Sequence, residues 1–139
     1  MSGAVFTFVG AIVGALLQFL FTRHLEGKRH HREVRAKAYA DYLQCVSEHA
    51  NLGYQRQSPE GRQLGARTAY AKCRISLYGS QDVVSSFAEF EKLGATMNTD
   101  AQCRAFSRMV IAMRRDTLGN PSVDEQDIEV VLLGRRNAT

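Results

Sequence analysis

The chain opens on an uninterrupted apolar stretch and then changes to apolar positions spaced as on amphipathic helices. Residues 3–22 are 20 positions without a charged side chain. A helix of that length rises about 30 Å, the thickness of the hydrocarbon core of a bilayer. The pattern therefore predicts a transmembrane helix over residues 1–22. A buried core helix of a soluble protein is the alternative, although soluble helices of this length rarely lack charge.

One side of this predicted helix carries small or polar residues, and the bulky apolar residues lie on the opposite side, with Phe21 as an exception. The spacing of Gly10 and Gly14 lets two helix backbones approach closely in lipid, and Gln18 on the same face can hydrogen-bond across helices. We therefore expect self-association, with a monomer carrying incidental glycines as the alternative. The predicted oligomer interface is Gly3, Thr7, Gly10, Ala11, Gly14 and Gln18.

After residue 34, apolar residues recur at helical spacing between glycines and capping residues. The first helix is expected to continue to about Leu52, with further helices at 59–78, 81–93 and 100–118 and a short one ending near Leu133. Capping boxes are predicted at Thr99–Gln102 and Ser122–Glu125. No useful length alternates with a period of two, so the predicted fold class is all-α: a transmembrane helix continuing into a cytosolic bundle of about four to five helices.

Inward-facing positions follow from the same spacing. The helix after residue 34 is expected to bury two adjacent rows, and each later helix is expected to bury one face. The expected core residues are Val34, Ala38, Tyr39, Tyr42, Leu43, Cys45, Val46, His49, Ala50, Leu64, Ala71, Ile75, Tyr78, Val83, Val84, Phe87, Phe90, Cys103, Phe106, Val110 and Met113.

The positive charge of the chain is concentrated beside the apolar stretch. Six bases and two acids lie between residues 23 and 37, and the rest of the chain sums to zero, with 12 bases and 12 acids. Because the bases follow the apolar stretch rather than precede it, we expect a retained anchor and not a cleaved signal peptide. The predicted membrane-surface residues are Arg23, Lys28, Arg29, Arg32, Arg35 and Lys37.

This charge bias predicts an orientation. Lysine and arginine favour the cytoplasmic side, so the N-terminus is expected outside and the C-terminal domain in the cytoplasm of a bacterial inner membrane. The bases would meet anionic headgroups of the bilayer, whereas nucleic acid is the less favoured partner. The expected division is a transmembrane helix over 1–22, a basic juxtamembrane neck over 23–37 and a cytosolic helical bundle over 38–139.

No motif of catalysis, phosphate binding or metal binding is present in the sequence. The three cysteines, Cys45, Cys73 and Cys103, are expected to be reduced and packed as small hydrophobes. No cofactor and no metal are expected. The one polar cluster that stands out is Arg114, Arg115 and Asp116, a candidate for binding a partner, although two bases at a helix C-terminus also complement the helix dipole.

Three short segments carry a resemblance: KAYADYL at 37–43, RISLYGSQDV at 74–83 and AMRRDTLG at 112–119. Together with the single span and the basic neck, they resemble a loose group of small, uncharacterised bacterial single-pass membrane proteins with a helical cytosolic domain. The layout is also similar to that of small anti-phage and CRISPR-associated membrane effectors that assemble into rings. The resemblance implies an inner-membrane location and no particular activity.

Three functions remain in competition on these grounds. The first is a non-enzymatic membrane effector that self-associates, one version being a pore lined by Thr7 and Gln18. The second is a membrane-tethered sensor or adaptor whose bundle binds a partner protein or a nucleotide signal. The third is a degenerate ribonuclease or other enzyme using Arg114, Arg115 and His49.

Overall fold

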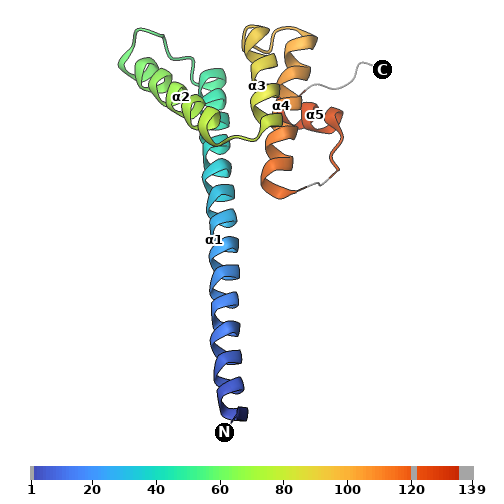
Figure 1. Ribbon diagram of the computed structural model, residues 1–139. Helices are drawn as coiled ribbons and strands as arrows, with labels where there is room; N and C mark the ends of the chain where they lie inside the picture. Colours follow the sequence, from blue (N-terminus) through green and yellow to red (C-terminus); the bar gives the residue numbers. More distant parts are fainter. Residues whose placement is uncertain (1, 120–121, 135–139) are drawn as a thin grey trace. The chain divides into compact units, whose positions relative to one another are not determined.

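The computed structural model describes residues 2–119 and 122–134, and of residues 2 and 4–7 only the backbone. All regular structure in these residues is helical, which confirms the predicted all-α class. The five helices of this part of the chain are labelled in Figure 1: α1 (Ser2–Asn51), α2 (Pro59–Tyr78), α3 (Gln81–Lys92), α4 (Asp100–Leu118) and α5 (Glu125–Leu133).

The chain divides into two units, residues 1–33 and residues 34–139. The first unit holds the apolar part of α1. Within Phe8–Leu52, an 18-residue window has a mean hydropathy of 1.5, and none of its residues is buried. By length and composition, this helix can cross a membrane.

The second unit, from Val34 onward, is called the helical bundle below. Residues of α1, α2, α3 and α4 share one hydrophobic core, and Leu133 of α5 packs against it. At its centre Phe90 and Phe106 lie with ring centroids 5.3 Å apart, and Tyr42 meets Phe87 edge-on at 4.8 Å. The bundle includes residues 34–37, which the charge pattern assigned to the basic neck.

Most of the expected core positions are buried. The confirmed ones are Ala38, Tyr39, Tyr42, Cys45, Leu64, Ala71, Ile75, Val83, Phe90, Cys103, Phe106 and Met113. Val34, Leu43, Val46, Phe87 and Val110 are half-buried.

Five positions expected inside are exposed instead. His49 and Ala50 lie in the last turn of α1, where His49 Nε2 is 3.2 Å from the hydroxyl of Thr68. Tyr78 and Val84 lie on either side of the turn between α2 and α3. Their backbone groups form hydrogen bonds there, with Arg35 and Ser80, while their side chains are exposed. Cys73 faces outward on α2, whereas Cys45 and Cys103 are buried as predicted.

The helix starts follow from capping side chains. Ser58 and Ser80 accept from the amides of Gly61 and Val83, at the starts of α2 and α3. Thr99 and Gln102 form the predicted capping box at the start of α4. Such caps satisfy backbone amides that have no partner within the helix.

The second predicted capping box is wrong. The cap of α5 is Asp124, whose carboxylate accepts from the amide of Gln126 at 2.9 Å. Glu125 does not turn back toward Ser122, because its carboxylate lies 3.4 Å from Arg108 of α4. A tertiary ion pair thus replaces the local reciprocal bond.

Two glycines end helices for different reasons. Gly119, at the end of α4, has a φ of 87°, which side chains with a Cβ rarely adopt. Gly79, between α2 and α3, has an ordinary φ of −64°. There a Cβ would lie 2.5 Å from the carbonyl oxygen of Ile75, so close packing requires the glycine.

Candidate functional site

The predicted oligomer interface lies on the apolar part of α1. Ala11 and Gln18 are exposed, as are Gly3, Gly10 and Gly14, and the side chain of Thr7 lies outside the described part of the structure. A Cβ added at Gly10 or Gly14 would meet no atom within 4 Å. The chain therefore leaves this face of the helix open to a neighbour.

The bulky side of the same helix is also uncovered. Phe8 is 70% exposed, Phe19 59% and Leu20 60%. Monomeric soluble proteins rarely expose contiguous apolar surface of this kind. Such a surface is typical of contact with lipid or with another protein.

The predicted membrane-surface residues divide between the two units. Arg23, Lys28, Arg29 and Arg32 are exposed on the first unit, and Arg29 pairs with Glu33 at 3.3 Å. Lys37 is exposed on the bundle.

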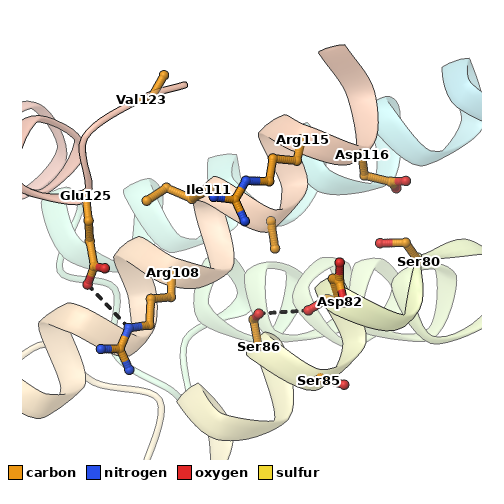
Figure 2. Close-up of a pocket in the computed structure, with 11 residues that line it drawn as sticks. Ser80, Asp82, Ser85, Ser86, Arg108, Ile111, Arg115, Asp116, Val123 and Glu125 are labelled. Carbon is orange, nitrogen blue, oxygen red and sulfur yellow. Dashed lines mark hydrogen bonds and ion pairs between the residues drawn. The ribbon is translucent and has the colours of Figure 1, made fainter. Parts of the chain in front are cut away.

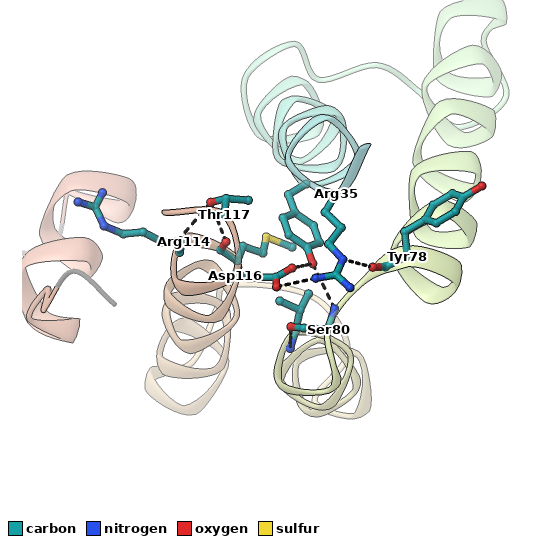
Figure 3. Close-up of polar contacts among 9 residues, drawn as sticks. Arg35, Tyr78, Ser80, Arg114, Asp116 and Thr117 are labelled. Atoms are coloured by element: carbon teal, nitrogen blue, oxygen red, sulfur yellow. Dashed lines mark hydrogen bonds and ion pairs between the residues drawn. The ribbon is translucent and has the colours of Figure 1, made fainter. Parts of the chain in front are cut away.

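Arg35 is half-buried in the bundle and is held by two other elements. Its Nε donates to the carbonyl oxygen of Tyr78 at 2.6 Å, and its Nη1 donates to Asp116 at 3.1 Å (Figure 3). Sequence reasoning missed this role, because nothing in the spacing distinguishes Arg35 from the other bases of the neck.

Tyr39 completes this arrangement one turn further along α1. Its hydroxyl donates to the second carboxylate oxygen of Asp116 at 2.5 Å and accepts from the amide of Ser80 at 3.4 Å. Burial, then the hydrogen bond to the Asp116 carboxylate, raises the pKa of Tyr39 well above its usual value. We call Arg35, Tyr39, the Tyr78 carbonyl, Ser80 and Asp116 the polar junction.

The polar junction contains residues from each of the three short segments that carry the resemblance. Tyr39 belongs to residues 37–43, Ser80 to residues 74–83 and Asp116 to residues 112–119. The fold brings these segments, which are remote in sequence, to one place in the bundle. Their polar residues thus fasten α1, the α2–α3 turn and the end of α4 to one another.

Further ion pairs fix α2 against the last turns of α1. Asp41 accepts from Arg74 at 2.7 Å, and the guanidinium of Arg74 also lies 5.5 Å from the centroid of the Tyr70 ring. Glu48 and Arg67 form a two-point pair, and this hydrogen-bonded guanidinium lowers the pKa of Glu48. These contacts position α2 for the surfaces described below.

A pocket opens beside the polar junction, between α3, α4 and the start of α5 (Figure 2). Its volume is about 680 Å³, within the range of small-molecule sites. Arg108 and Arg115 line it from α4, while Asp82 and Glu125 supply opposite charge. Ser80 and Asp116 belong both to this α3–α4 pocket and to the polar junction.

The three partner-binding candidates therefore have different surroundings. Arg115 lines the α3–α4 pocket, and its side chain is exposed. Arg114 is exposed and points away from the polar junction (Figure 3). The Asp116 side chain is only 10% exposed and is engaged by Arg35 and Tyr39, so it is not displayed for a partner in this state.

No group of three or more His, Cys, Asp or Glu residues that could hold a metal ion occurs in the described part of the chain. No protein-family model, no curated protein and no solved structure matches the chain. Function is therefore inferred from the chain's own residues.

Proposed function

We propose that this chain is a single-pass inner-membrane protein that self-associates through the small-residue face of its transmembrane helix. In this proposal it acts as a non-enzymatic membrane effector or pore-type assembly. The observation that carries the proposal is the division of one exposed apolar helix into a bulky side and a side where Gly10 and Gly14 have open space above them. Such surfaces let helices approach closely in lipid.

The distribution of charge supports the orientation. Arg23, Lys28, Arg29 and Arg32 are exposed directly after the apolar stretch, where a cytoplasmic flank carries its bases. Each base near an anionic leaflet contributes about 1 kcal/mol of attraction. The helical bundle is then cytoplasmic, and the N-terminus lies outside.

Gln18 is the residue proposed to form hydrogen bonds between the associated helices. Its amide is exposed on α1, and in lipid it would lack hydrogen-bond partners unless another helix or water supplied them. In a ring, Gln18 and Thr7 would be the polar lining of a narrow and mostly apolar passage. The layout of ring-forming anti-phage effectors is the analogy for this form.

The test replaces Gly10 and Gly14 together by leucine. Bulky side chains on this face should separate the helices, so the mass of the full-length protein in nanodiscs is expected to fall from a defined oligomer to a monomer. Gly27→Leu is the matched control, since its position on α1 also has open space but lies outside the apolar stretch. An oligomer of unchanged mass in the double variant would refute the proposal.

A second candidate is a membrane-tethered sensor or adaptor whose bundle binds a partner protein or a nucleotide signal. The α3–α4 pocket favours it, because Ser80 and Asp116 connect a ligand-sized cavity to the contacts that hold α1. It predicts that Gly10 and Gly14 are dispensable for function. It also predicts that the bundle keeps its ligand without the apolar stretch.

A further inference from the structure

A second concave surface of the bundle lies where the end of α1, the following loop and α2 as far as Lys72 meet. Its cavity has a volume of about 480 Å³. Four basic residues from these three segments line it: His49, Arg56, Arg62 and Lys72. We call this surface the basic groove.

The basic groove differs from the α3–α4 pocket in its charge. No aspartate or glutamate lines the basic groove, whereas three acids line the α3–α4 pocket. Lys72 is paired with Glu91 at 2.7 Å. The ion pairs in the described part of the chain include neither Arg56 nor Arg62, and both residues are exposed, so two guanidinium groups are available to an anion.

Small residues form the wall of the groove that α2 supplies. Gly61, Gly65 and Ala69 lie along it, and a Cβ added at Gly65 would meet no atom within 4 Å. A ligand can therefore approach the α2 backbone closely. Gly61 has a separate structural role, because a Cβ there would lie 2.0 Å from the carbonyl oxygen of Gln55.

We propose that the basic groove binds a small phosphate-bearing molecule of nucleotide size. Arginine guanidinium groups bind phosphate oxygens through paired, charge-assisted hydrogen bonds, which are stronger than hydrogen bonds between neutral groups. A cavity of about 480 Å³ exceeds the size of a phosphate ion and accommodates an attached organic group. This site is independent of the assembly of the membrane helices.

Two classes of molecule could bring a phosphate group to the basic groove: a soluble nucleotide and a lipid headgroup. Full-length protein in phosphatidylcholine nanodiscs is titrated calorimetrically with ATP, with glycerophosphoglycerol as the headgroup without its chains, and with adenosine as the phosphate-free control. Tighter binding of ATP identifies the nucleotide source. Tighter binding of glycerophosphoglycerol identifies the lipid source.

The variants test whether the phosphate lies in the groove. Arg62→Gln and Arg56→Gln are each expected to weaken binding of the preferred probe about tenfold, the loss typical of one charge-assisted hydrogen-bonded contact. Arg104→Gln is the matched control, since Arg104 is an exposed arginine of α4 outside the groove. It should bind as the unaltered protein does.

Gly65→Leu provides a steric test that leaves the charges in place. Leucine favours helix and its Cβ finds open space, so the far-ultraviolet circular dichroism should be unchanged while binding is lost. Two results overturn the proposal: neither phosphate probe binds, or binding is equally strong in Arg62→Gln, Gly65→Leu and the control. Binding of adenosine as tight as that of ATP overturns it as well.

Discussion

Asp116 joins α4 to α1 through both of its carboxylate oxygens. One carboxylate oxygen accepts from Arg35 and the other from Tyr39, and the side chain is 10% exposed. Groups buried in this way are costly to leave without a partner. The polar junction is therefore a determinant of how α1 packs on α4.

Asp116→Asn is expected to lower the free energy of unfolding by about 1–3 kcal/mol, because the amide cannot serve both donors and loses the charge that balances Arg35. Urea denaturation of the full-length protein in nanodiscs measures the change. Asp127→Asn, at an exposed position of α5, is the control and should stay within about 0.5 kcal/mol of the unaltered protein. An equal loss in both variants would contradict the role given to Asp116.

Tyr39 gives the polar junction a dependence on alkaline pH. Its pKa is raised in the folded state, so the stabilisation is complete below the unfolded value of about 10 and is lost as the pH rises above it. The free energy of unfolding should therefore fall on raising the pH from about 9 to about 11, and Tyr39→Phe should reduce that fall. Identical pH profiles of the two proteins would refute this assignment.

At the scale of elements, one side chain makes three hydrogen bonds within the connection between α3 and α4. Gln102 accepts from the amides of Asn98 and Thr99, and its Nε2 donates to the carbonyl oxygen of Leu93 at 2.6 Å. It thereby joins the capping box of α4 to the end of α3. Figure 1 shows these two helices side by side.

Thr99→Ala removes only the cap and should lower the free energy of unfolding by about 1 kcal/mol. Gln102→Ala should cost more, because it leaves the Leu93 carbonyl and two amides without this partner. Thermal denaturation in nanodiscs, with the exposed turn residue Thr96→Ala as control, compares the three variants. A larger effect of Thr99→Ala than of Gln102→Ala would contradict this account.

At the scale of the whole molecule, the chain divides into two units with different surfaces. The apolar part of α1 exposes its bulky residues, whereas the bundle has its own core. A unit with its own core is expected to fold by itself. The two units can therefore be tested separately.

Residues 34–139 expressed alone should be soluble, helical and cooperative in thermal unfolding. In the proposed function, this fragment should also be monomeric, because the small-residue face of α1 is missing. Circular dichroism and sedimentation measure both properties. A fragment that lacks cooperative unfolding would show that the bundle needs the rest of α1, and an oligomeric fragment would place self-association in the bundle.

The sequence by itself determined the helices, their ends and most of the buried faces. These properties depend on local chemistry: the spacing of apolar residues, the hydroxyl caps of Ser58, Ser80 and Thr99, and the glycine after α4. It also determined the apolar stretch and its basic flank, since length and charge along the chain suffice to recognise both.

Only the tertiary structure decided which polar residues meet. Asp116 is paired with residues 81 and 77 positions earlier in the chain, and no periodicity encodes such a distant partner. For the same reason, only the structure shows that Arg35 belongs to the bundle and that Glu125 pairs with Arg108. It also shows that Arg56 and Arg62 line one groove. Charged side chains are long and flexible, and which ion pairs they form depends on how the helices pack. Their roles therefore follow from the fold.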